Sequence, residues 1–315
     1  MNPKNHRVVS IRTGRQGQSQ QQSDGYDFAV QCIENGEIMH CGLGPDLESK
    51  LLYVEQSQLA QRLMKSRHIH LFDIGLGAAS NALAAFKSAS EIQRRDTKSE
   101  SISSGDPSDS GAGSLLVTSF ETDLESLHLA FENQDQFRHF RGWESAVKAL
   151  LENGQWASVD GQLQWRLKMG DFRTTLANGP MIGLLGNGPT EADVIYYDMY
   201  SPKSSPQLWT IDTLGLLRGH TSDTGALYTY TRSTRARVAL LLGGFFIGRG
   251  IAAGLKAETT VAAASLEALA VPLDARWLLQ FTRSQLDFSD AEKAAVLAHP
   301  QFSGVLSNLE SVGEA

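Results

Sequence analysis

Four short apolar runs place the strongest constraint on how this 315-residue chain can fold. They read IHLFDIG, SLLVTSFE, ADVIYYD and GALYTYT, and each is followed by a segment with helical periodicity. Continuous apolar runs of this length are typical of strands that are covered on both faces, and strands that alternate with helices form parallel sheets. The chain is therefore predicted to be an α/β protein with a Rossmann-like, mostly parallel sheet. The runs occupy residues 69–75, 114–121, 192–198 and 225–231.

The remaining patterns complete this architecture. GFFIGRG and LKAETTVAAA predict a late antiparallel hairpin, and the segment after Pro272 predicts C-terminal helices. YDFAVQCIENGEIMHC predicts an N-terminal β-hairpin with a two-residue turn at Asn35 and Gly36, in which Cys32 faces Met39. The helices between the strands are expected at residues 78–87, 123–133, 136–152, 206–218 and 233–243.

The chain is expected to have three parts. Residues 1–25 are predicted to be a flexible tail, because the part rich in Gln, Ser and Gly cannot bury enough apolar surface to order itself. The main domain is expected at 26–264, with residues 88–114 as an inserted loop. Residues 265–315 form the expected helical extension.

Charge and cysteine content exclude several classes of protein. The net charge of −7 argues against binding nucleic acid by bulk electrostatics, although a local basic face remains open. The two cysteines predict neither a disulfide nor a metal site. No apolar run reaches the length of a membrane span and no secretory signal is evident, so a cytoplasmic protein without membrane contact is expected.

A glycine-rich turn follows the first apolar run. Asp73, Gly75 and Gly77 lie in DIGLGAAS, where a strand passes into a helix. Glycine lets the backbone approach a ligand at such a turn, and the helix N-terminus offers free N–H groups. The sequence lacks the last glycine of a dinucleotide-binding fingerprint, so a turn that only reverses the chain is the alternative.

Acidic residues end the next two predicted strands. Glu121 in SFETDL could accept hydrogen bonds from a ribose diol, or it only complements the dipole of the following helix. Asp171 and Phe172 in MGDF could meet an amine-bearing base and cover its face, although Asp171 also suits a helix N-cap. With no P-loop Lys-Ser/Thr, these acidic strand ends suit a nucleoside ligand without phosphates, and S-adenosylmethionine fits better than NAD or ATP.

Together these motifs resemble those of class I S-adenosylmethionine-dependent methyltransferases, and among them the family that methylates the bacterial tRNA wobble uridine. The most specific match is DMYSPKSSPQLW (198–209), which is similar to an Asp-x-Phe-Ser-Pro-x-x-x-Pro-x-x-Trp signature. The resemblance spans about residues 26–264. Further matching segments are LYVEQSQLAQRL, FDIGLGAASNALAAF, SFETDL, MGDF, TYTRSTRARVALLLGGF and GLKAE.

The resemblance implies an enzyme that converts 5-aminomethyl-(2-thio)uridine of tRNA to its 5-methylaminomethyl form, with S-adenosylmethionine as cofactor. Asp198 is the expected catalytic residue, because a carboxylate can accept the proton of the acceptor amine. The implied cofactor-binding residues are Asp73, Gly75, Gly77, Asn81, Glu121, Asp171 and Phe172. The implied residues on the tRNA side are Ser201, Pro202, Lys203, Trp209, Arg237 and Lys256.

Alternatives stay open for several of these residues and for the function. Trp209 is equally well explained as a core residue, and Arg237 and Lys256 as surface charges. Ala79 stands where the family has a third glycine, and Met199 and Tyr200 differ from the family signature. Methylation of a small-molecule or protein amine, or a non-catalytic binding role, are the alternative functions.

The family resemblance also bears on partners. In many bacteria this methyltransferase is fused to an FAD-dependent oxidoreductase, and no such part is found in this chain. A separate tRNA-modifying oxidoreductase or an aminomethylating enzyme complex is therefore an expected partner.

Overall fold

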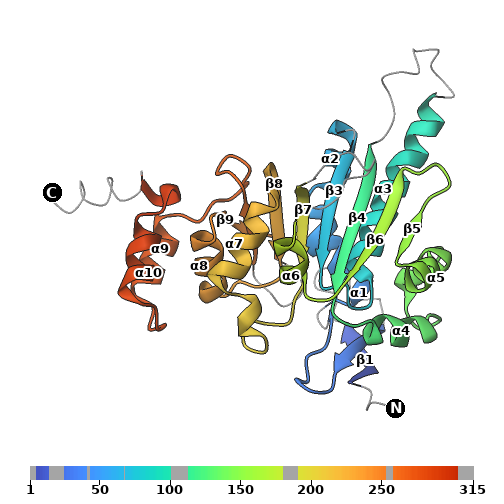
Figure 1. Ribbon diagram of the computed structural model, residues 1–315, viewed down its shortest axis with the longest axis horizontal. Helices are drawn as coiled ribbons and strands as arrows, with labels where there is room; N and C mark the ends of the chain where they lie inside the picture. The colour runs from blue at the N-terminus through green and yellow to red at the C-terminus, as the bar shows by residue number, and fades with distance from the viewer. Residues whose placement is uncertain are drawn as a thin grey trace.

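The computed structural model describes residues 5–13, 25–40, 43–66, 68–100, 113–179, 191–252 and 258–303. Its centre is an eight-stranded sheet with the strand order β5-β6-β4-β3-β7-β8-β10-β9 (Figure 1). Strands β6, β4, β3, β7 and β8 run parallel, while β5 and β10 run antiparallel to their neighbours. The strands are β3 (His68–Ile74), β4 (Ser114–Glu121), β5 (Gln155–Ala157), β6 (Leu163–Met169), β7 (Ala192–Tyr197), β8 (Thr221–Thr229), β9 (Phe246–Gly250) and β10 (Thr259–Ala263).

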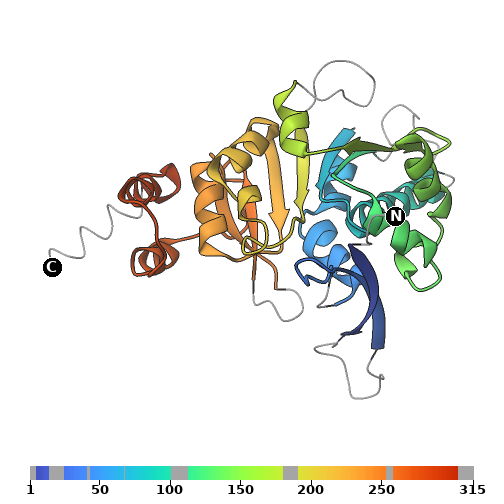
Figure 2. The same cartoon turned by 60° about the horizontal axis from the view of Figure 1, so that its bottom comes forward.

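Helices cover both faces of this sheet (Figure 2). One face carries α1 (Pro45–Ser49), the π-helical η1 (Lys50–Glu55), α2 (Leu59–Lys65), α3 (Ser80–Glu100), α4 (Glu125–Glu132), the short 3₁₀ turn η2 (Arg138–Phe140) and α5 (Glu144–Asn153). The other carries α6 (Phe172–Ala177), the 3₁₀ turn η3 (Pro206–Leu208), α7 (Ile211–Gly219) and α8 (Thr234–Leu242). The predicted α/β class with a mostly parallel sheet and a late antiparallel hairpin is confirmed.

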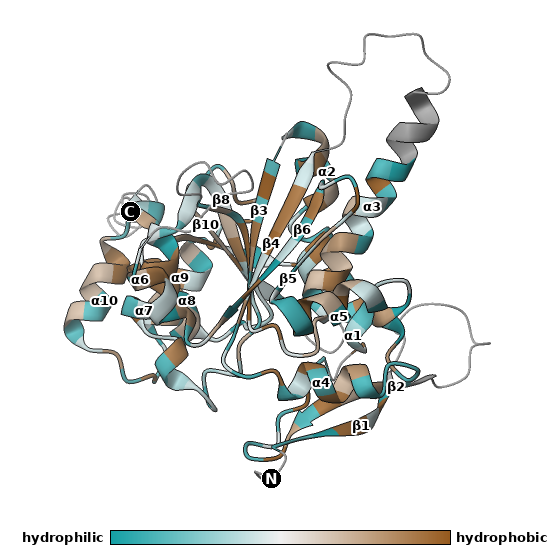
Figure 3. Cartoon of the chain, turned by 45° about the vertical axis from the view of Figure 1, so that its right-hand side comes forward, coloured by the Kyte–Doolittle hydropathy of each residue, from teal (hydrophilic) through white to brown (hydrophobic). Residues whose placement is uncertain are grey.

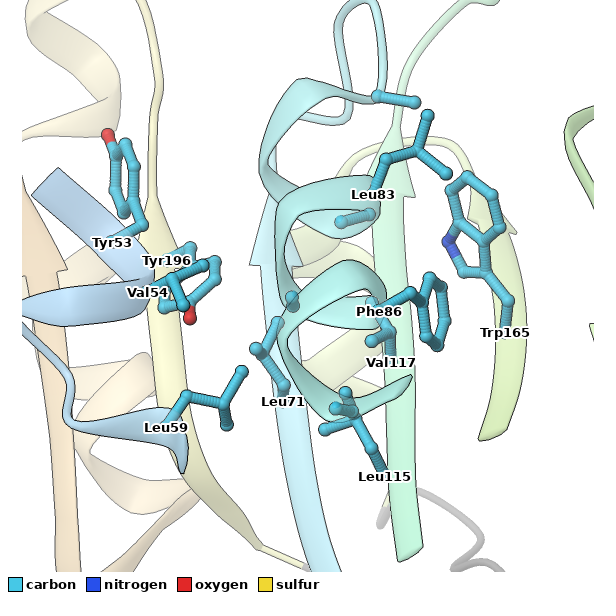
Figure 4. Packing of buried hydrophobic residues seen from close by; sticks show 14 of the residues in the cluster. Tyr53, Val54, Leu59, Leu71, Leu83, Phe86, Leu115, Val117, Trp165 and Tyr196 are labelled. Atoms are coloured by element: carbon cyan, nitrogen blue, oxygen red, sulfur yellow. The ribbon is translucent and has the colours of Figure 1, made fainter. Parts of the chain in front are cut away.

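Side chains point alternately to the two faces of the sheet along each strand, and a separate hydrophobic core lies on each face. Leu71 faces the core under α3, whereas the adjacent Phe72 faces the core under α7 and α8, as expected when successive side chains point to opposite sides of a sheet. Figure 3 shows the apolar colouring of β3 and β4 that two-sided burial requires. In the first core Phe86 packs against Trp165 with ring centroids 5.4 Å apart (Figure 4).

The N-terminal region differs from the prediction. Residues assigned to a flexible tail form β1 (His6–Thr13), which pairs antiparallel along its length with β2 (Gly25–Cys32). The turn after β2 is also longer than predicted, since Gln31 pairs with Ile38 and Cys32 N donates to Glu37 O. The expected pairing of Cys32 with Met39 is wrong because a four-residue turn, with Gly36 at a φ of 74°, shifts the register.

The expected insertion loop is partly helical. Helix α3 continues through Glu100, so the prediction of a loop is wrong for residues 88–100. Buried Phe86, Ala89 and Ile92 extend the apolar stripe of the helix at spacings of three residues, which explains why it does not end earlier. The rest of that prediction, residues 101–112, lies outside the described residues.

The helical extension lies at the far edge of the sheet, beside α8 (Figure 1). It contains α9 (Ala275–Thr282), α10 (Asp290–Leu297) and the 3₁₀ turn η4 (Pro300–Phe302). Trp277 stacks on Phe281 and Phe302 and joins the second core. Within the described part of the chain, no helix has the length and apolar character needed to cross a membrane.

Candidate functional site

A cavity of about 740 Å³ opens at the carboxyl ends of the central strands. Strand β3 has β4 on one side and β7 on the other, so the chain reverses direction across the sheet at this point. Ligands of open α/β sheets bind outside such a reversal point, because the loops there diverge and leave a crevice. The cavity is lined by the loops after β3, β4, β6, β7 and β8, and by residues 36–40 after β2.

The glycine turn after β3 forms the floor of the cavity. Gly75 and Gly77 adopt φ values of 91° and 52°, which glycine tolerates without steric cost. A Cβ at Gly75 would lie 3.0 Å from both Asp198 O and the Met199 sulfur. Glycine at this position therefore allows the loops after β3 and β7 to touch.

Ala79, the departure from the family glycine pattern, also has a left-handed backbone, with a φ of 64°. That conformation costs a residue with a side chain roughly 1–2 kcal/mol. Its methyl group is fully buried in the core and does not line the cavity. The substitution therefore does not narrow the cavity.

The acids predicted to hold the nucleoside lie around the cavity. Glu121 Oε2 accepts a hydrogen bond from Gly77 N at 3.0 Å, and Oε1 accepts one from Thr122 N at 2.7 Å. Burial nevertheless raises the pKa of Glu121. A carboxylate offers about four lone-pair positions, so two backbone donors leave capacity for a diol.

Asp171 has the capping role that was the alternative for it. Its side chain accepts from Arg173 N at the start of α6 and from Arg173 Nε at 3.0 Å. The hydrogen bonds from Arg173 lower the pKa of Asp171, although burial opposes them. Asp171 and the buried Phe172 still line the cavity, with the Phe172 ring edge-to-face with Tyr197.

Asp73 does not line the cavity. It is fully buried beneath the glycine turn, where Ser119 Oγ donates to its Oδ2 at 2.8 Å. Burial raises its pKa to about 8, with a smaller contribution from the Asp198 and Glu121 charges. The group is therefore neutral at pH 7 and supports the turn from below.

This raised pKa predicts how stability varies with pH. The unfolded chain ionises Asp73 above about pH 4, whereas the folded protein keeps it protonated up to about pH 8. The free energy of unfolding should therefore fall as pH rises between these values, by at most roughly 5 kcal/mol from this group. In urea unfolding, Asp73→Asn should gain most over wild type at pH 8 and least at pH 4. A difference that does not change with pH would contradict this account.

Asp198, the expected catalytic residue, follows β7 directly and lines the cavity. Asn81 Nδ2 donates to its Oδ2 at 2.8 Å, and His40 Nε2 lies 3.8 Å from the same oxygen. Both contacts fall on one oxygen, and the hydroxyl of the buried Tyr53 also interacts with this carboxylate. Asn81 belongs to α3 and does not line the cavity, so it contacts Asp198 from behind the cavity wall.

The loop from Asp198 to Trp209 is tied to the body by aromatic residues. Tyr230 Oη donates to Met199 O at 2.9 Å, and Trp209 Nε1 donates to Tyr200 O at 2.9 Å. Trp209 is buried, packs edge-to-face on Tyr197, and does not line the cavity. Its predicted contact with substrate is therefore wrong, and the alternative of a core residue holds. Met199 and Tyr200, the departures from the signature, both line the cavity.

Glu37, in the turn after β2, is hydrogen-bonded to Ser201 and Ser204 of the same loop, and we call this contact the Glu37 clasp. Its Oε1 accepts from Ser201 Oγ at 2.5 Å and from Ser204 Oγ, and its Oε2 accepts from Ser201 N at 3.2 Å. Although burial opposes them, these hydrogen bonds lower the pKa of Glu37. Ser201, predicted on the acceptor side, lines the cavity with its hydroxyl directed to Glu37.

Replacing Glu37 tests the clasp. In Glu37→Gln the amide presents donors to the Ser201 donors, so we expect a loss of about 1–2 kcal/mol in stability and a KM for the methyl acceptor raised severalfold. The affinity for S-adenosylmethionine should change less. Glu34→Gln, an exposed change in the same turn, is the matched control, and equal effects of both variants would argue against the clasp.

Residues 37–40 are the part of the site that sequence analysis missed. ENGEIMH was interpreted only as a hairpin turn, yet Glu37, Met39 and His40 all line the cavity. The Met39 sulfur covers Gly77, 3.2 Å from where a Cβ would lie. The clustering of a carboxylate, a thioether and an imidazole within four residues was the available signal.

Arg237, implied by the resemblance to lie on the tRNA side, is not at the surface. Arg237 is buried at 3% exposure, and it donates to Glu258 Oε1, Thr259 O and Thr260 Oγ1 at 2.9–3.0 Å. It is therefore a structural residue, and its prediction as an RNA contact is wrong. Lys203 is exposed and Pro202 is half-buried, and neither residue lines the cavity. Lys256 lies outside the described residues.

Negative charge dominates the cavity. Arg173 is the cationic side chain among the described lining residues, apart from two histidines, and it pairs with Asp171. A cleft with one sign of charge attracts ligands of the opposite charge. The site suits a sulfonium and an amine better than a phosphate. The acids that line it are Glu37, Glu48, Glu121, Asp123, Asp171 and Asp198.

The residues present fit S-adenosylmethionine. Positive-φ glycines expose backbone at the floor, carboxylates suit a ribose diol and the positive charges of the methionine part, and Phe172 offers an aromatic edge. Residues 141–265 match the family model described as S-adenosyl-L-methionine-dependent methyltransferase. The matched residues and the mostly parallel sheet have the features of a class I S-adenosylmethionine-dependent methyltransferase.

Among the solved structures that are similar to this chain, one with a TM-score of 0.60 shares its fold. The chain is similar to MnmC2 from Aquifex aeolicus with a TM-score of 0.60 and 19% identity, covering 86% of this chain and 80% of that one. It also matches spermidine synthase from Thermotoga maritima with a TM-score of 0.42 and 11% identity, covering 90% and 80%. None of the curated proteins matches the sequence. The resemblance expected from the motifs is thus confirmed as a likeness of fold.

Proposed function

We propose that this methyltransferase methylates the primary amine of 5-aminomethyl-(2-thio)uridine at the wobble position of tRNA. The main support for the proposal is the position of Asp198. It directly follows β7 at the reversal point of the sheet, and its backbone oxygen packs against Gly75 of the glycine turn. The fold shared with MnmC2 and the DMYSPKSSPQLW signature support the tRNA acceptor.

The reaction needs a neutral amine held in line with the methyl group. S-adenosylmethionine supplies an electrophilic methyl carbon on a sulfonium. Asp198 takes a proton from the acceptor ammonium, which leaves the nitrogen lone pair free to attack. Asn81 holds the carboxylate in place at 2.8 Å, while Glu37 and Trp209 hold the loop that carries it. Met39, Met199 and Tyr200 line the cavity, where they would contact an acceptor and limit its exposure to water.

Transfer of tritiated methyl groups to tRNA from a strain lacking this gene tests the proposal. The label should appear in 5-methylaminomethyl-(2-thio)uridine after nucleoside digestion and mass spectrometry. Label that never enters tRNA while S-adenosylmethionine binds normally in calorimetry would reject the tRNA acceptor.

A small-molecule or protein amine is the second candidate. Two observations favour it, namely the acidic cavity and the burial of Arg237 away from any phosphate. A panel of amines offered in the same assay separates the two, because a true small acceptor would be methylated in the absence of tRNA. A separate oxidoreductase or aminomethylating complex would have to supply the primary amine of the tRNA acceptor.

A further inference from the structure

His40 lines the cavity, but the reaction proposed above gives it no role. It lies between β2 and α1, lines the cavity, and places Nε2 3.8 Å from Asp198 Oδ2 although 158 positions separate the two in sequence. Its side chain is 9% exposed. Its backbone has a φ of 54°, a left-handed conformation that is strained for a residue with a side chain. Strain of this kind persists only where the surrounding structure fixes the conformation, and it is found most often at active sites and ligand-binding sites.

The chemistry of the proposed reaction leaves a task for an imidazole. An alkylammonium ordinarily titrates near pH 10 and a carboxyl near pH 4, so a carboxylate alone is a weak acceptor for this proton. An ordinary imidazole titrates near pH 6.5, between the two. A neutral imidazole beside the carboxylate can therefore draw the proton onward and return Asp198 to its charged form.

We propose that His40 accepts, through Asp198, the proton released by the methyl-acceptor amine. This inference rests on the proposed amine methylation. The ammonium N–H bond breaks, its electron pair stays on nitrogen, and the proton passes to Asp198 and then to His40 Nε2. The nitrogen lone pair forms the bond to the methyl carbon as the C–S electrons return to sulfur. Water finally removes the proton from the imidazole.

The 3.8 Å separation fits this order of events. It is too long for a hydrogen bond, so the two groups are close enough to interact without being hydrogen-bonded in this structure. A protonated Asp198 can reach His40 after a small side-chain rotation or through one water molecule. The other titratable groups around Asp198 and His40 are Glu37, Glu48, Tyr53, Asp73, Tyr230 and, from η2, His139. Glu37 already accepts from serines, and burial lowers the pKa of His139, whose Nε2 contacts Ala78 O at 2.9 Å.

Two variants at the same position test the proposal by rescue. His40→Gly accepts the left-handed φ without strain and leaves space for a free imidazole, whereas His40→Asn tolerates the same φ but fills the space. We expect both to lower kcat for methyl transfer by roughly 10–100-fold. Added imidazole should restore His40→Gly severalfold and leave His40→Asn unchanged. S-adenosylmethionine affinity, measured by calorimetry, should stay near wild type in both.

Full activity of His40→Gly, or lost activity that imidazole does not restore, would overturn the proposal. If wild type methylates an amine from the panel and not tRNA, the tRNA acceptor is rejected, and the same rescue is measured with that amine.

A readout that needs no acceptor is ¹⁵N NMR of histidine-labelled protein. Its His40 signals are assigned by their loss in His40→Asn. The proposal requires neutral His40 to carry its proton on Nδ1, with Nε2 unprotonated toward Asp198. A proton resident on Nε2 would overturn it.

Discussion

Replacing Asp198 by asparagine is expected to lower kcat for methyl transfer by roughly 10²–10⁴-fold, the usual contribution of a positioned general base. The amide keeps the size of the side chain and an oxygen that can accept from Asn81, so the loop after β7 should keep its shape. What is lost is the ability to take a proton from the acceptor ammonium. The measurement is single-turnover transfer of labelled methyl groups to undermodified tRNA.

Two controls separate this chemical effect from a loss of folding or binding. The affinity of Asp198→Asn for S-adenosylmethionine, measured by calorimetry, should change by less than about threefold, because removal of one charge at a partly solvated site costs little binding. Asp212→Asn makes the same change on the exposed surface of α7 and should behave like wild type. Wild-type kcat in Asp198→Asn would remove this residue from the mechanism.

Arg237→Ala is expected to give the largest change in stability, a loss of about 3–5 kcal/mol in the free energy of unfolding. Removing a buried charged donor leaves its buried acceptors unsatisfied. Here Thr259 O and Thr260 would lose this donor beside β10, whereas the half-buried Glu258 would keep its contact with Arg249 at 3.7 Å. Urea unfolding of the purified variant measures the loss.

The same variant also decides the role of Arg237 in RNA binding. At a temperature where it is fully folded, its KM for tRNA and the salt dependence of binding should match wild type. Arg232→Ala, an exposed change just before the same helix, is the control for stability. Unchanged stability together with a weaker salt dependence would restore the phosphate contact predicted from the sequence.

Local pattern was sufficient to predict most of the secondary structure. The four apolar runs became β3, β4, β7 and β8, because burial on both faces selects strongly for continuous apolar sequence. The polar regions were predicted less well. β1 and residues 88–94 of α3 have mixed composition, and what orders them is packing against partners distant in sequence.

The sequence by itself determined the class of fold and four of the cavity-lining elements, namely the glycine turn after β3, the acids after β4 and β6, and Asp198 after β7. These depend on strand ends and on glycine, which are local properties of the chain. Only the tertiary structure decided that Glu37 and His40 join them, that Trp209 and Arg237 are buried, and that Asp73 is neutral. Each of those outcomes depends on burial and on contacts between segments distant in sequence, and neither is encoded in the spacing of residues along the chain.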